Sequence, residues 1–200
     1  MTTRQTGRMQ TEGLRERKRR ETLQRITAAG MQLFIRQGYD NTTLDEIAEA
    51  AGISRRTFFY YFKSKDEILL SMQRLNSDKL TVAVRGAPKA ARPLETIRDA
   101  VIRVSEAIPA KEMIGIHRLM KSSAAVQARK HVTYVENENA LVDALREKFP
   151  DPKQETALRL AAMMSVGAMR LAVETLDAEN GKRPLPDILR EIFATMDKGI

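Results

Sequence analysis

The chain has 200 residues, enough for one large or two smaller domains with a buried core. Hydrophobic residues make up 42% and charged residues 30%, a balance that is typical of globular proteins and argues against disorder. There is no cysteine, which excludes disulfides, thiolate metal sites and cysteine nucleophiles.

The net charge of +8 is concentrated near the N-terminus, where residues 1–25 hold eight Arg or Lys against three Glu. This points to a polyanionic partner, either nucleic acid or an anionic membrane surface. No segment approaches the roughly 18 apolar residues that span a bilayer. Residues 1–20 also lack the apolar core of a signal peptide, so we expect a cytoplasmic protein without a membrane partner.

The N-terminal segment changes character near residue 15. Residues 1–14 lack helical periodicity and are expected to form a basic, mobile arm. Beyond them, apolar and small side chains recur every three or four positions, which predicts an amphipathic helix. Gly38 lies where a C-terminal cap is expected and should end this helix. The stripe comprises Leu23, Ile26, Gly30, Leu33, Phe34 and Gln37.

Three helices with clear start signals follow. Thr43–Glu46 is a Ser/Thr-x-x-Glu capping box, which predicts a short helix that Gly52 ends. Ser54 is a typical N-cap for a helix over about 55–62. Ser64–Glu67 is a second capping box and should open a longer helix.

The rest of the chain has the pattern of five more helices. The segment 86–93 contains Gly86, Pro88 and Pro93 and is the best candidate linker. No segment shows the alternation that is typical of a strand. We therefore expect an all-α protein of about nine helices. The further helices are expected over 93–107, 109–122, 124–148, 153–178 and 186–197.

Residues 43–65 have the features of a helix-turn-helix. Ala48 and Ala51 are small where two helices must cross closely, and Gly52 tolerates the positive φ of the turn. Ser54 can satisfy the free amides at the start of the second helix. That helix is rich in Arg, Thr and Tyr, which suits it to the major groove of DNA.

The stretch from Gly38 to Leu69, GYDNTTLDEIAEAAGISRRTFFYYFKSKDEIL, resembles the tetracycline-repressor (TetR) family. The resemblance covers about residues 18–70; beyond residue 80 it is one of helix number and length only. It implies a homodimeric regulator, in most members a repressor, that binds operator DNA. The implied organisation is a basic arm over 1–14, a three-helix DNA-binding domain over 15–66 and a C-terminal helical ligand-binding and dimerisation domain over 67–200.

The resemblance also implies roles for individual residues. Thr43 should offer its hydroxyl and amide to a phosphate, Lys65 should contact phosphate, and Tyr61 should lean on the DNA backbone. Arg56 stands where a small residue is usual and is suited to the O6 and N7 atoms of guanine. Phe59 replaces a usual phosphate-binding Tyr, a role that Tyr60 can take over. The expected DNA contacts are Thr43, Arg55, Arg56, Thr57, Tyr60, Tyr61 and Lys65.

For each of these residues an ordinary structural role remains open. Arg55 and Arg56 are alternatively solvated surface charges, Tyr60 and Tyr61 packing residues, and Lys65 an idle surface lysine. The basic run over 15–20 is either a solvated helix start or a contact to phosphate or the minor groove.

The C-terminal half is expected to supply a dimer face and an effector site. A small-residue surface and an apolar stripe on the last two helices suggest a four-helix interface between two copies. It would comprise Leu158, Ala161, Ala162, Ser165, Ala168, Met169, Ile188, Ile192, Phe193 and Met196. Methionines and polar interruptions indicate an adaptable pocket for a small molecule, or else a Met-filled core. The candidate ligand-binding residues are Met113, His117, Met120, Tyr134, Asn137 and Met163.

A constitutive or architectural DNA-binding protein without an effector is the main alternative to a ligand-responsive repressor. An enzyme is disfavoured, because the chain lacks the common nucleotide-binding, hydrolase and metalloprotease motifs. His117 and His131 do not have metal-ligand spacing, so no metal or cofactor is expected.

Overall fold

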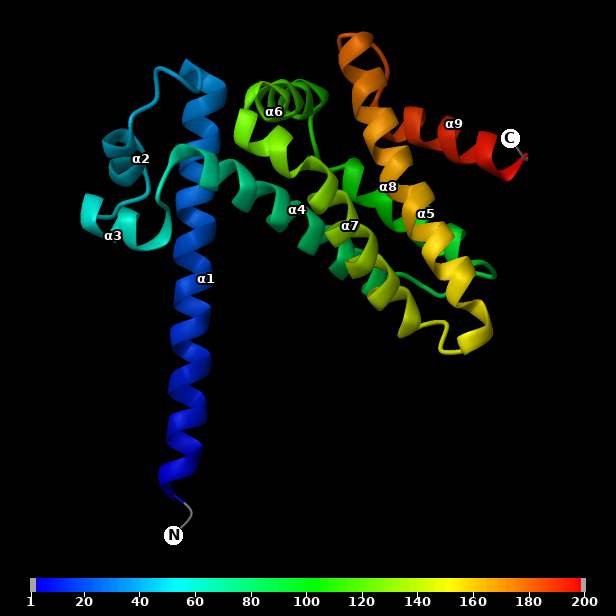
Figure 1. Ribbon diagram of the computed structural model, residues 1–200, viewed down its shortest axis with the longest axis horizontal. Coiled ribbons are helices and arrows are strands. Elements are labelled where there is room, and N and C mark those ends of the chain that lie inside the picture. The colour runs from blue at the N-terminus through cyan, green and yellow to red at the C-terminus, as the bar shows by residue number, and fades with distance from the viewer. Residues whose placement is uncertain (1–2, 199–200) are drawn as a thin grey trace. The chain divides into compact units, whose positions relative to one another are not determined.

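The computed structural model describes the backbone of residues 3–198 and the side chains of residues 13–198 (Figure 1). Within those residues it contains nine α-helices, one short 3-10 helix and no strand, which confirms the expected all-α class. The chain forms two compact units, Met1–Gln73 and Arg74–Ile200. The helices are α1 (Thr3–Gln37), α2 (Leu44–Ala50), α3 (Arg55–Tyr61), α4 (Lys65–Gly86), α5 (Pro93–Ser105), α6 (Ala110–Ser122), α7 (Ala124–Arg146), α8 (Glu155–Ala178) and α9 (Leu185–Asp197).

α1 begins at Thr3, earlier than the start expected near residue 15. The side chains of residues 1–12, most of the predicted arm, lie outside the described part of the chain, so the mobile arm stays a prediction. At its other end α1 stops as expected: Gly38 has φ +90° and its amide donates to Phe34 O at 3.0 Å.

α1, α2, α3 and the start of α4 enclose the core of the N-terminal unit. A Cβ at Gly30 would lie 3.1 Å from the Cδ1 and Cγ2 atoms of Ile68, so glycine is what lets α1 and α4 approach. Beside it, Thr27 Oγ1 donates to Ser71 Oγ at 3.1 Å, and this pairing satisfies two buried hydroxyls. The largest fully buried side chains of this core are Ile26, Ile47, Phe58, Ile68 and Leu69.

The start of α4 differs from the predicted capping box. Ser64 Oγ does accept from the amide of Glu67, at 3.4 Å. Glu67 Oε2 accepts instead from the amide of Lys63, at 2.7 Å. The carboxylate therefore caps the chain one residue before the position that the capping box requires.

α8 is the central helix of the C-terminal unit and packs against α5, α6, α7 and α9 (Figure 1). The residues that it buries are mostly small, which allows close approach of its neighbours. Most of the surface expected to form the dimer face is this buried side, so its buried residues are not available to a second copy and that part of the assignment is wrong. Leu158, Ala161, Ala162, Ser165 and Ala168 are buried inside the protomer with Ile188 and Phe193, and Met169, Ile192 and Met196 pack on the same core.

The outer side of α8 is also apolar. Leu160, Met163 and Leu171 are each about half exposed, and the helical spacing places Gly167 between them. With this second apolar side, Pro152–Ala178 is the one described segment long and apolar enough to cross a membrane, with a mean hydropathy of 1.3. Its packing against four neighbouring helices identifies it as the core helix of the C-terminal unit.

Candidate nucleic-acid interface

The predicted capping box at the start of α2 is present. Thr43 Oγ1 accepts from the amide of Glu46 at 3.2 Å, while the amide and hydroxyl of Thr43 donate to Glu46 Oε2 at 2.7 and 2.9 Å. These hydrogen bonds to the carboxylate lower the pKa of Glu46. Both groups of Thr43 that are expected to meet a phosphate therefore hold the Glu46 carboxylate in this structure, and a phosphate would have to displace it.

The turn between α2 and α3 has the expected geometry. Gly52 has φ +63°, and the amide of Ile53 donates to Ala48 O at 3.0 Å. Ala48 and Ala51 are both buried, as their small size at the crossing of two helices predicts, and α2 packs against α1 and α3.

α3 has one buried and one exposed side. Ser54 Oγ accepts from the amide of Thr57 at 3.1 Å and caps the helix. Phe58 and Phe62 are buried, whereas Tyr60 is 76% exposed, with its ring 5.2 Å from that of Tyr61. Arg55 and Arg56 are exposed with Tyr60, and Thr57 and Tyr61 are partly buried.

Arg55 is held by two neighbours that the sequence analysis did not assign to it. Its Nη1 donates to Asp45 Oδ2 at 2.9 Å, and its guanidinium carbon lies 5.7 Å from the centre of the Phe59 ring. Phe59 itself is 45% exposed. The pairing orients a cation at the start of α3 and places a carboxylate beside it. No sequence period links Asp45 to Arg55, which lies ten positions later on another helix.

Lys65 differs from the other predicted contacts, because its ammonium is directed into the protein. It donates to backbone carbonyls in the turn between α1 and α2. Tyr39 and Asp66, which were not predicted as functional residues, complete this cluster. Of the seven predicted DNA contacts, the structure thus places Thr43 at the N-cap of α2, five on α3 and Lys65 in a partly buried cluster.

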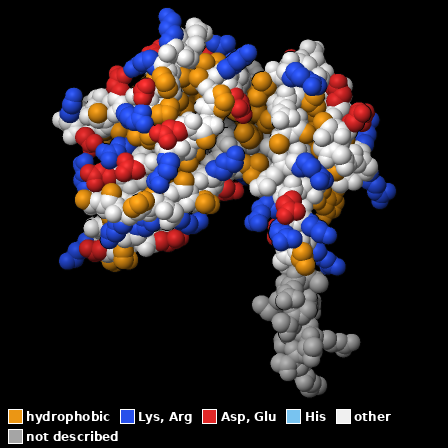
Figure 2. Space-filling view, turned by 180° about the vertical axis from the view of Figure 1, so that it is seen from behind, with side chains coloured by type: hydrophobic (Ala, Val, Ile, Leu, Met, Phe, Trp, Pro, Cys, Tyr) orange, Lys and Arg blue, Asp and Glu red, His pale blue; other side chains and the backbone are white. Residues whose placement is uncertain are grey.

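The first described turns of α1 form a second basic surface. Figure 2 shows Lys and Arg side chains gathered on the part of α1 that adjoins the undescribed side chains. Two of the arginines have weak intrahelical partners: Arg17 Nε lies 3.5 Å from Glu21 and Arg19 Nη1 lies 3.8 Å from Glu16. These pairs are well exposed and contribute little to stability. The surface comprises Arg15, Arg17, Lys18, Arg19 and Arg20.

The predicted effector residues lie in different environments. Met163 is 53% exposed on the outer side of α8, whereas Met113 and Tyr134 pack against the core. His117 Nε2 lies 3.9 Å from Asp177 Oδ2, on α8. The other two, Met120 and Asn137, are partly buried.

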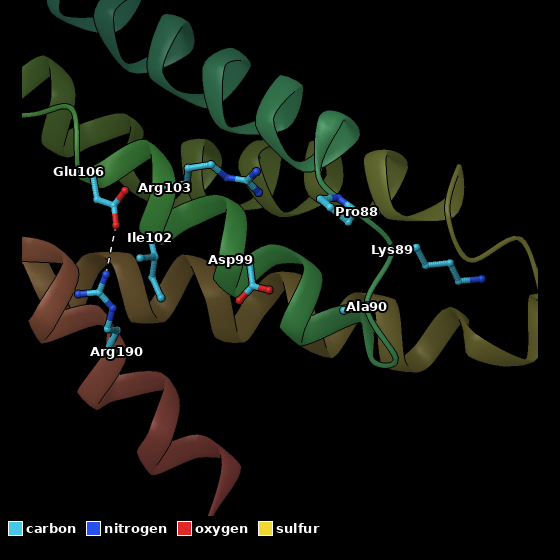
Figure 3. Close-up of a pocket in the computed structure, with 8 residues that line it drawn as sticks. All are labelled: Pro88, Lys89, Ala90, Asp99, Ile102, Arg103, Glu106 and Arg190. Atoms are coloured by element: carbon cyan, nitrogen blue, oxygen red, sulfur yellow. Dashed lines mark hydrogen bonds and ion pairs between the residues drawn. The ribbon is translucent and has the colours of Figure 1, made fainter.

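The structure has a groove elsewhere in the C-terminal unit, between α5, α9 and the loop that follows α4 (Figure 3). Its volume is about 490 Å³, and Glu106 and Arg190 form an ion pair of 3.1 Å at one end. Its charged side chains are all exposed, and no predicted effector residue lines it. Among the described residues, no cluster of three or more His, Asp or Glu is suited to a metal ion.

Two family models match the chain. Residues 26–72 match the model described as "Bacterial regulatory proteins, tetR family", which covers the helix-turn-helix. Residues 91–200 match the model described as "MftR C-terminal domain". Together they account for the DNA-binding motif and for most of the C-terminal unit.

Curated relatives and solved structures agree with these matches. The chain is 34% identical over 104 residues to the HTH-type transcriptional regulator TcmR of Streptomyces glaucescens, and the match covers 52% of this chain and 46% of TcmR. The chain therefore spans about half the length of that relative. Its fold resembles the fatty acid degradation regulator FadR of Bacillus halodurans, with 20% identity, a TM-score of 0.64 and coverage of 90% of this chain and 96% of FadR.

A further solved structure is the Thermus thermophilus FadR in complex with lauroyl-CoA, described as a TetR family transcriptional repressor. It has 24% identity, a TM-score of 0.58 and coverage of 89% of this chain and 94% of that one. At this identity the likeness establishes the fold. With the tetR model over the helix-turn-helix and the C-terminal model over more than half of the chain, the protein belongs to the TetR family of bacterial transcriptional regulators.

Proposed function

We propose that the protein is a ligand-responsive repressor that binds a palindromic operator as a homodimer in the cytoplasm. The observation that carries the proposal is α3, which exposes Arg55, Arg56 and Tyr60 on a helix whose other side is anchored by Phe58. The family regulates transcription by binding DNA and is not a family of enzymes. A constitutive DNA-binding protein without an effector is the alternative.

In the proposed complex each protomer places α3 in the major groove, and two such helices lie about 34–36 Å apart on successive turns of the duplex. Arg56 is unobstructed by any described ion pair and contacts a guanine edge. Thr43 contacts a phosphate once Glu46 is displaced, and Arg55, Thr57, Tyr60 and Tyr61 border the same groove. The basic start of α1 adds phosphate contacts.

The effector part of the proposal rests on the C-terminal unit and on the solved neighbour that contains lauroyl-CoA. We place the site among α6, α7 and α8, near Met113, His117 and Tyr134, because these helices contact one another and carry partly buried polar residues. By linkage, an effector that weakens operator binding is itself bound more weakly by the operator complex, by the same factor.

Selection from a random duplex library with the purified full-length protein is expected to enrich a palindrome. Arg56→Ala should then cost about 1–3 kcal/mol per half-site and relax specificity at one base pair, because a bidentate guanine contact is lost. The measurement is affinity for the selected duplex and for its single-base variants. Arg74→Ala, an exposed arginine on α4 outside the motif, is the control. Enrichment of no sequence would support the architectural alternative.

Lauroyl-CoA is the first effector to test. We expect it to release the operator duplex in a fluorescence anisotropy titration, with half-release at a lower concentration than free CoA requires. If a ligand binds only the DNA-free form, the apparent Kd for the operator rises in proportion to the ligand concentration once that concentration exceeds the Kd of the ligand. Unchanged anisotropy at saturating lauroyl-CoA would remove acyl-CoA from the proposal.

A further inference from the structure

The ammonium of Lys65, the first residue of α4, is saturated by the turn that joins α1 to α2. Nζ donates to the carbonyl oxygens of Tyr39 at 2.7 Å and Thr42 at 3.0 Å, and the carbonyl oxygen of Asp40 lies at 3.5 Å. An ammonium has three N–H donors and no acceptor. These three carbonyls therefore use the full hydrogen-bonding capacity of the side chain.

A second set of interactions stabilises the same turn through the side chain of Tyr39. Lys65 Nζ lies 4.5 Å from the centre of the Tyr39 ring, a cation–π distance, and Tyr39 Oη donates to Asp66 Oδ1 at 2.9 Å. The ring also packs on Phe34, with centres 4.9 Å apart. Burial and the neighbouring Asp66 carboxylate raise the pKa of Tyr39, so the phenol stays a donor. Lys65 and Asp66, two consecutive residues of α4, thus both bind Tyr39 of the turn.

The turn leads directly into the N-terminus of α2. Thr42 is buried, its Oγ1 donates to Gly38 O at 2.7 Å, and its carbonyl is one of the Lys65 acceptors. Thr43, the next residue, carries the amide and hydroxyl that we propose to meet a phosphate. Lys65 therefore fixes the residue that precedes this phosphate-binding group.

We propose that Lys65 is a positioning residue for operator binding, which acts through the 39–42 turn on Thr43 and does not itself contact phosphate. The inference rests on the proposed DNA-binding function. A positioning role and a phosphate contact can be told apart by how operator affinity depends on salt. A lysine that neutralises a phosphate releases counterions, whereas a lysine engaged by carbonyls affects affinity only through the geometry that it maintains.

The decisive experiment measures the affinity of the full-length protein for its selected operator over a series of KCl concentrations. Lys65→Met is expected to weaken binding by about tenfold or more at every concentration, the loss expected when a hydrogen bond to a charged group is lost. The slope of log affinity against log salt should stay that of the wild type. A slope reduced by roughly 0.9 per protomer would overturn the proposal, because it would mark a lost phosphate contact.

Lys65→Arg provides an independent test in case the methionine variant unfolds. A guanidinium binds phosphate at least as well as an ammonium, but its planar fork cannot donate to three carbonyls around one point. The proposal therefore predicts a loss of at least about tenfold in affinity for Lys65→Arg as well. Affinity equal to or above that of the wild type would overturn it. Lys63→Met, two residues away, exposed and outside the cluster, controls for the removal of one charge.

A double-mutant cycle identifies the group through which Lys65 acts. If Lys65 positions Thr43, then Thr43→Val should cost little further affinity in the Lys65→Met background, because the contact is already lost. Additive losses would overturn the proposed route. If the wild-type protein selects no operator, the proposed function fails first. Hydrogen exchange of the Thr42 and Thr43 amides, which donate to Tyr39 O and to the Glu46 carboxylate, then tests the turn by itself: it should be faster in Lys65→Met but not in Lys63→Met.

Discussion

Leu171→Glu is expected to convert the proposed homodimer into a monomer and to abolish tight operator binding, because we propose that two copies meet through the exposed apolar side of α8. Leu171 is 49% exposed on the outer side of α8, in line with Leu160 and Met163. In a two-fold interface one substitution places a carboxylate on each of the two copies, and an unpaired buried carboxylate costs several kcal/mol. We therefore expect dimer affinity to fall at least about 100-fold. Analytical ultracentrifugation of the full-length protein measures this directly.

A matched control distinguishes the proposed interface from any other exposed apolar patch. Val135 is 55% exposed on α7, so Val135→Glu introduces the same charge at an equally exposed position on another helix. This variant should remain a dimer and keep its operator affinity. The reverse pattern, with a dimeric Leu171→Glu and a monomeric Val135→Glu, would move the interface to α7.

The helix boundaries were the most predictable part of the fold, because local chemistry specifies them. Thr43, Ser54 and Gly52 act on residues three or fewer positions away, and each has the predicted geometry. Pro93 begins α5 as expected, since a missing amide has no cost in the first turn. Ser64–Glu67 shows the limit of such signals. The capping box predicts that the Glu67 carboxylate accepts from the amide of Ser64, but it accepts from the amide of Lys63, which the sequence pattern does not distinguish.

The side of α8 that its own protomer covers could not be predicted, because both sides are apolar. Ala161, Ala162 and Ala168 lie on the covered side, in a helix against which four helices of the same protomer pack. The sequence shows the amphipathic period but does not indicate which side its own core covers. Leu160 and Leu171, which lie outside the predicted dimer face, are the exposed residues.

The candidate site was predicted in its residue types but not in its pairings. Arg55 was predicted from its place on the second helix of the motif and Lys65 from the resemblance, yet their partners Asp45 and Tyr39 lie ten and 26 positions away in the sequence. Such contacts depend on how α2, α3 and the turn before them pack. A basic residue in the motif can therefore be directed at DNA or at its own backbone, and only the fold distinguishes the two.

Phe58→Ala and Phe59→Ala are expected to separate folding of the N-terminal unit from recognition of DNA. Phe58 is fully buried in that unit, whereas its neighbour Phe59 is 45% exposed. Removing the buried ring should cost about 3–5 kcal/mol, because a cavity replaces it. Removing the exposed ring should change the free energy of unfolding by less than about 0.5 kcal/mol. Hydrogen exchange of α1, α2 and α3 in the full-length protein measures the stability of this unit separately.

The two variants should also lose DNA affinity for different reasons: Phe58→Ala because the N-terminal unit unfolds, and Phe59→Ala while that unit stays folded. Phe58→Ala weakens binding in proportion to the population of unfolded N-terminal unit, so the operator itself should restore protection from exchange when it is in excess. Phe59→Ala leaves the unit folded but frees Arg55 from the ring that it lies over, so its affinity loss should persist at any temperature where the protein is native. If Phe59→Ala also exposed the amides of α3, the ring would be part of the core, and the outward side of α3 would have to be reassigned.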